Sequence, residues 1–238
     1  MRVSWPPLTR FTKLVMGVLF GAFVALAVAQ GVTGVPFAAV LALDTRVVGL
    51  HTAWQFFAWP LVIPFGDGAI LDAALALFFA YLIISPFDAR YGARNALALL
   101  GWCTVGAGVG ALVGGLLLGL LVGRGTDPLY GSSPVLWGVL IGGLFASPGD
   151  RVMVFGRFEA KRWQLLLAVL VFSIFPVLQT RGAVMASFYG TWGAVGAAVL
   201  WARIFSAPKR TMRKPPAKRP AHLRVIEGGR EEPPKVLH

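Results

Sequence analysis

A candidate nucleophile lies in the segment 131–134, Gly-Ser-Ser-Pro, at the start of a long apolar run. Its Ser133 carries a hydroxyl, which attacks a carbonyl efficiently only when a general base lies beside it. The chain has three histidines for that role: His51, His222 and His238. None of them lies in an apolar run. The sequence therefore shows a serine at the start of an apolar run, but no histidine in such a run that could act as its general base.

Two further residues carry chemistry inside apolar runs. Asp72 is a candidate because an ionisable side chain in a membrane segment often has a function. It lies near the start of its run, so a position at the membrane interface without a role is the alternative. The single cysteine, Cys103, excludes an intramolecular disulfide and a cysteine metal site. We expect neither a metal nor an organic cofactor.

The elements that position these residues are apolar helices. Of the 238 residues, 57% are hydrophobic and 13% are charged, against about a quarter charged in an average soluble domain. Six apolar runs cover residues 14–29, 69–84, 95–123, 129–148, 163–180 and 182–202. Each is near the ~20 residues that cross the hydrocarbon as a helix, and lipid cannot satisfy exposed backbone groups. The sequence predicts an all-α polytopic membrane protein with about six transmembrane helices.

The net charge of +12 is spread unevenly. Basic residues gather at both ends of the chain and in alternate connections, which places both termini in the cytoplasm. We expect a cytoplasmic N-terminus over residues 1–13 and a membrane domain over 14–204. Residues 205–238 form a basic, proline-rich tail, which we expect to be disordered and to contact anionic lipid head groups rather than nucleic acid. As an alternative, the first run and Ala27-Val-Ala29 form a signal peptide with its cleavage site.

The connection 33–68 is too interrupted by prolines for a transmembrane helix and too apolar for a free loop. It contains Trp54, Phe57 and Trp59, so we expect it to lie half embedded in the outer membrane interface. An aromatic belt that only anchors the helices is the alternative. Glycines recur in the run 95–123, and this predicts close helix packing.

Several short segments follow one another in a characteristic order. They are 41–44 (Leu-Ala-Leu-Asp), 54–57 (Trp-Gln-Phe-Phe), 88–92 (Asp-Ala-Arg-Tyr-Gly), 131–134 with Gly138, 154–156 (Val-Phe-Gly) with Trp163, and Gly193 with Gly196. In this order they resemble the rhomboid superfamily of intramembrane proteins, over residues 10–205. Gln55 stands where the family usually has an arginine. The resemblance implies a bundle of six transmembrane helices with a membrane-embedded first outer loop.

The resemblance also implies where a protease of this family would hold its catalytic groups. Ser133 matches the nucleophile, and the histidine base of the sixth helix falls near Tyr189. Tyrosine has an ordinary pKa near 10 and is a poor base at neutral pH. The oxyanion-stabilising positions of the second helix fall near Asp72 and Ala76, and an anionic Asp72 would repel an oxyanion. The departures predict a catalytically inactive member with Ser133 as a remnant.

The expected function is to bind transmembrane segments of client proteins without cleaving them. The expected contacts are Asp72, Tyr189, Trp54, Phe57 and Trp59. The alternative is an intramembrane serine protease that uses Ser133 with an unrecognised base. A small-solute transporter is a third class, but the third, fifth and sixth runs carry almost no polar groups for a path. The tail and the lack of a cysteine framework fit a bacterial inner membrane.

Overall fold

The computed structural model describes residues 7–44, 53–63, 68–123, 127–147, 151–154, 158–179 and 185–205. The chain divides into two units, Met1–Ala207 and Pro208–His238. All described residues belong to the first unit. The tail 206–238 and the three histidines lie outside the described residues, as do residues 1–6 of the expected N-terminal segment.

Each of the six predicted apolar runs forms a helix. The helices are α1 (Arg10–Thr33), α4 (Ala69–Tyr91), α5 (Ala93–Val122), α6 (Ser133–Ala146), α7 (Arg162–Gln179) and α8 (Met185–Phe205). Within the described residues, α1, α4 and α5 are long and apolar enough to cross a membrane. These three helices indicate a membrane protein. α1 begins at Arg10, four residues before the predicted run, because Thr9 caps its first turn through a bond from the Thr12 N–H.

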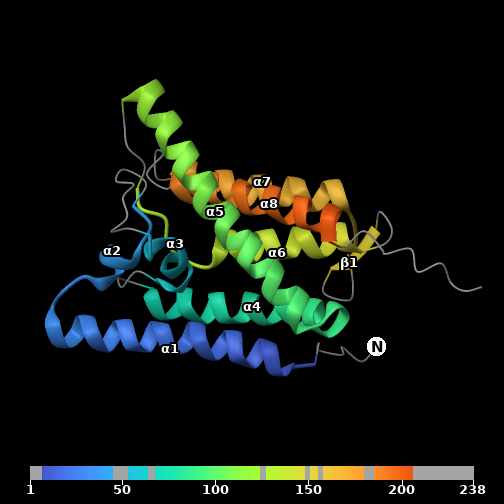
Figure 1. Ribbon diagram of the computed structural model, residues 1–238, viewed down its shortest axis with the longest axis horizontal. Helices are drawn as coiled ribbons and strands as arrows, with labels where there is room; N and C mark the ends of the chain where they lie inside the picture. Colours follow the sequence, from blue (N-terminus) through green and yellow to red (C-terminus); the bar gives the residue numbers. More distant parts are fainter. Residues whose placement is uncertain are drawn as a thin grey trace, which may run out of the picture. The chain divides into compact units, whose positions relative to one another are not determined.

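α6 is the most enclosed of the long helices, with eight of its 14 residues buried. It packs against α8, α5, α4 and α7. Figure 1 shows α1 and α4 side by side and antiparallel, with α5 crossing α6 and α8 at an angle. The hydrophobic core is therefore built around α6.

Glycines bring α5 and α8 into backbone contact. A Cβ atom added at Gly110 would lie 2.5 Å from the carbonyl oxygen of Tyr189, and one at Gly106 would lie 2.6 Å from that of Gly193. Only residues without side chains allow two helices to approach so closely. Gly193 takes part in this contact, whereas a Cβ at Gly196 would meet nothing.

The connections carry short elements. The described part of the first connection holds α2 (Phe37–Leu41), α3 (Gln55–Ala58) and the 3-10 helix η2 (Trp59–Leu61), and no helix there is long enough to cross a membrane. Between α6 and α7, β1 (Arg151–Val154) pairs antiparallel with β2 (Phe158–Lys161). The sequence did not predict this hairpin, so the chain is mostly rather than entirely helical.

Basic residues gather at one end of the bundle, where Asp88 and Glu159 also lie. α1, α5 and α7 begin at one end, and α4, α6 and α8 finish there (Figure 1). That end holds every described basic residue: Arg10, Lys13, Arg90, Arg94, Arg151, Lys161, Arg162 and Arg203. The opposite end holds Asp44, Asp72 and Asp127, with no lysine or arginine among the described residues. We call them the basic end and the acidic end.

Candidate functional site

The first connection, between α1 and α4, is hydrogen-bonded to the residues just before α6. We call this connection the connecting segment. Leu43 and Leu129 exchange two backbone hydrogen bonds of 2.9 Å each, in an isolated antiparallel bridge. The N–H of Gly131 donates to the carbonyl oxygen of Trp59 over 3.1 Å. These bonds satisfy backbone groups that would otherwise need another partner. They fix α3 and η2 beside the first turn of α6.

A buried amide holds the rest of this segment together. Gln55 is 8% exposed. Its Nε2 donates to the carbonyl oxygen of Val40 over 2.9 Å, and its Oε1 accepts from the backbone N–H of Asp44 over 3.4 Å. The residue that departs from the family pattern at this position therefore ties the end of α2 to α3 through neutral hydrogen bonds.

The start of α6 is shaped by a glycine and a proline. Gly131 has φ +85°, in the left-handed region, where residues with a Cβ are strained. Pro134 lies in the first turn of α6, where its missing N–H has no partner to lose. This placement agrees with the sequence prediction that α6 opens at residues 131–134.

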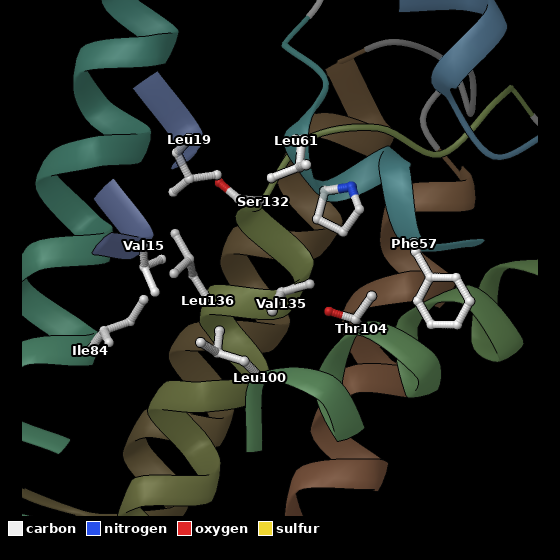
Figure 2. Close-up of a pocket in the computed structure, with 11 residues that line it drawn as sticks. Val15, Leu19, Phe57, Leu61, Ile84, Leu100, Thr104, Ser132, Val135 and Leu136 are labelled. Atoms are coloured by element: carbon white, nitrogen blue, oxygen red, sulfur yellow. The ribbon is translucent and has the colours of Figure 1, made fainter. Parts of the chain in front are cut away.

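A cavity of about 180 Å³ lies beside this helix start. It is lined by Val15, Leu19, Phe57, Pro60, Leu61, Ile84, Leu100, Thr104, Ser132, Val135 and Leu136. Figure 2 shows Val15 and Leu19 of α1 on one side, facing Phe57 of α3 and Thr104 of α5 on the other. Six elements therefore meet around one small apolar space.

The residues that line the cavity offer few groups that could take part in a reaction. Among the described residues that line it, the hydroxyls of Ser132 and Thr104 are the only polar side-chain groups, and none of the lining side chains is a carboxylate, an amine or an imidazole. A serine at this position has no general base among the described residues that line the cavity. The cavity can hold an apolar side chain and offer one or two hydrogen bonds.

The structure turns Ser132, rather than Ser133, towards the cavity. Ser132 is 7% exposed and lines the wall, whereas Ser133 is exposed and does not. Successive helical residues point about 100° apart, and here this difference turns the Ser133 side chain out of the wall. Sequence reasoning missed Ser132 because the family pattern matched Ser133.

Asp72 and Tyr189 lie away from the cavity. Asp72 is exposed in the first turn of α4, where a carboxylate is favourable at the positive end of the helix dipole. The half-buried ring of Tyr189 lies against Gly114 of α5. Neither side chain lines the cavity with Ser132. The structure does not bring these predicted site residues together with either serine.

The three predicted aromatic residues have different surroundings. Phe57 is 69% exposed and also lines the cavity. Trp54 is 43% exposed at the start of α3. Trp59 is completely buried, so it packs the core beneath the connecting segment and cannot contact a client helix. Of these three, Phe57 alone lines the cavity.

Thr104 is, besides Ser132, the other polar residue of the cavity wall that the sequence analysis did not single out. A threonine within the apolar run 95–123 is a visible signal, since hydroxyls in membrane helices often form interhelical contacts. Its position four residues after Leu100 places both on one face of α5, and both line the wall.

No described group of three histidine, cysteine, aspartate or glutamate side chains could hold a metal ion. Comparison with protein-family models gives no match. Comparison with curated proteins also gives no significant match.

Proposed function

We propose that this chain is a rhomboid-like membrane protein that holds transmembrane segments of client proteins without cleaving them. The observation that carries the proposal is the cavity beside the start of α6. Its apolar wall favours an apolar side chain, and its hydroxyls lie without an adjacent proton acceptor among the lining residues. A single large aliphatic or aromatic side chain fits a space of about 180 Å³.

The proposed topology has six transmembrane helices and a membrane-embedded first outer loop. α6 has 14 residues, about 21 Å at 1.5 Å per residue, which is less than the ~30 Å of the hydrocarbon. Gly131, two residues before the start of α6, is bonded to Trp59 of the connecting segment, as expected for a helix that begins below the membrane surface. This geometry supports the rhomboid-like arrangement that the order of sequence segments implies.

The proposed orientation puts the basic end in the cytoplasm, with both termini, in a bacterial inner membrane. The support is the separation of charge between the basic and acidic ends, because basic residues remain on the cytoplasmic side. The cavity, lined by Phe57 on one side and by Val15 and Ile84 on the other, would then lie between the two ends, within the depth of the membrane. Its access to clients would be from within the lipid.

The first test measures whether any serine is activated. Purified full-length protein in detergent is treated with a fluorophosphonate probe, beside Ser132→Ala, Ser133→Ala and an active rhomboid protease as positive control. We expect no labelling of this chain, because an unactivated hydroxyl reacts poorly. Labelling that disappears in either alanine variant would replace the proposal with an intramembrane serine protease.

The second test measures client binding. A photoreactive phenylalanine analogue replaces Phe57, and the matched control replaces Phe175, which is 57% exposed on α7 and does not line the cavity. The protein is reconstituted with a synthetic transmembrane peptide rich in leucine. We expect crosslinks from position 57 that exceed those from position 175. Equal yields at both positions would mean chance encounters in the lipid and would contradict the proposal.

A further inference from the structure

A second site lies at the basic end, where α4 and α6 finish and α7 begins. Ser147, the residue after α6, is its centre. Arg90 Nη1 donates to Ser147 Oγ over 3.2 Å, Tyr91 OH lies 3.2 Å from the same oxygen, and Arg162 Nη2 donates to the Ser147 carbonyl oxygen over 2.7 Å. We call these four residues the Ser147 cluster. Three helix ends are joined through one serine.

The direction of each hydrogen bond in the cluster follows from the serine proton. Ser147 Oγ donates to the carbonyl oxygen of Gly143 over 2.8 Å, and a hydroxyl has one proton. The same oxygen must therefore accept from both Arg90 and Tyr91. Ser147 is a neutral anchor that holds two guanidinium groups and neutralises neither charge.

An aromatic ring lies beside each of the two guanidinium groups. Arg90 Cζ lies 5.4 Å from the centre of the Tyr91 ring, and Arg162 Cζ lies 5.5 Å from that of Phe145. Such cation–π contacts are favourable within about 6 Å. They stabilise both positive charges at this position beside Ser147.

Arg90 keeps most of its donors available. A guanidinium has five N–H donors. Arg90 is exposed and uses one of them on Ser147 Oγ, and no carboxylate among the described residues forms an ion pair with it. Arg94 and Lys161 add positive charge at the same end. A planar fork of this kind recognises phosphate oxygens in pairs.

The depth of the cluster fits a lipid head group. Trp163, next to Arg162, is 59% exposed, and exposed tryptophans mark the membrane–water interface. The cluster also lies at the ends of apolar helices, where phospholipid phosphates are found. A binding site for a soluble anion has no physical reason to lie at the membrane–water interface.

We propose that the Ser147 cluster binds the phosphate of an anionic phospholipid at the cytoplasmic side. Arg90 donates two N–H groups to the phosphate, and Ser147 and Tyr91 hold Arg90 in place. This proposal depends on the membrane location and not on client binding. A failure of the lipid experiment would therefore leave the proposal of client binding unaffected, and the reverse also holds. It concerns the folded bundle, separately from the tail.

Lipid retention by native mass spectrometry tests this site. The full-length protein is released from detergent micelles that contain phosphatidylglycerol or phosphatidylcholine at equal concentration, and bound lipid is counted. We expect preferential retention of phosphatidylglycerol. Arg90→Gln should bind it about tenfold more weakly, the order expected for losing a hydrogen bond to a charged group. Arg90→Lys keeps the charge, loses the planar fork and should give an intermediate loss.

Lys13→Gln is the matched control, because it removes one exposed positive charge from α1 at the same end without touching the cluster. We expect its lipid retention to equal that of the unaltered protein. Equal retention of both lipids, or an equal loss in Lys13→Gln and Arg90→Gln, would overturn the proposal. Displacement of phosphatidylglycerol by inorganic phosphate at similar concentration would assign the site to a soluble anion instead.

Discussion

The backbone N–H of Gly131 donates to the carbonyl oxygen of Trp59 over 3.1 Å. This bond joins Gly131 and Ser132, the two residues before α6, to the segment that carries Phe57. Ser132 and Phe57 line opposite parts of the same cavity. The cavity shape is therefore controlled by a backbone contact as well as by side chains.

Replacing Gly131 with alanine should destabilise the protein by about 1 kcal/mol, from left-handed backbone strain partly offset by a less flexible unfolded chain. A Cβ there would meet its first neighbour, the Val62 carbonyl oxygen, only at 3.9 Å, so the cost is conformational rather than steric. Gly131→Asn should cost less, because asparagine adopts this conformation more readily. SDS-titration unfolding measures both; equal effects would contradict this explanation.

Replacing Gly110 with alanine should destabilise by about 1–3 kcal/mol, because an added methyl group overpacks a tight contact. Its Cβ would lie 2.5 Å from the Tyr189 carbonyl oxygen. Gly101→Ala is the control on the same helix, since a Cβ there meets nothing within 4 Å. The free energy of unfolding should fall in the first variant and stay equal or rise in the second. Equal losses would mean that helix contact is not the cause.

Replacing Gln55 with alanine should cost about 0.5–1.5 kcal/mol for each of the two hydrogen bonds that its buried amide makes. Gln164→Ala is the matched control, because Gln164 is exposed and accepts from the Lys161 N–H at the other end of the bundle. Limited proteolysis of the connecting segment should accelerate in Gln55→Ala only. An unchanged cleavage rate would show that the amide bridge does not hold the segment.

Filling the cavity should abolish most crosslinking of the leucine-rich peptide from position 57. Thr104→Phe introduces a ring into the cavity wall, whereas Val105→Phe places the same ring on a residue that is 42% exposed and outside the wall. The second variant should crosslink like the unaltered protein. If both variants crosslink normally, client side chains do not enter this cavity.

The six apolar helices could be predicted because length and apolar composition alone decide which segments remain helical in lipid. The hairpin of β1 and β2 could not, since its four-residue strands are too short for a clear alternating pattern. The first turn of α1 was also missed, because Arg10 and Lys13 ended the apolar run although Thr9 caps the helix before them.

The candidate site was predicted less well than the helices. The place where α6 opens followed from the segment 131–134, but the choice between Ser132 and Ser133 depends on helix rotation at that point. One residue along a helix turns a side chain by about 100°, so a shift of one residue in the alignment changes which serine is expected to face the cavity. Trp59 was expected at a surface because tryptophan favours interfaces, whereas the bonds of its own segment bury it.

Gly92 is the single residue between α4 and α5, with φ +84°. One residue cannot reach across a bilayer, so these two long apolar helices must enter it as a linked hairpin during synthesis. Arg90 and Arg94 lie on either side of this joint, and in the proposed orientation they would keep it on the side where translation occurs. The direction in which α4 is inserted would then decide the direction of α5, before α6, α7 and α8 are synthesised.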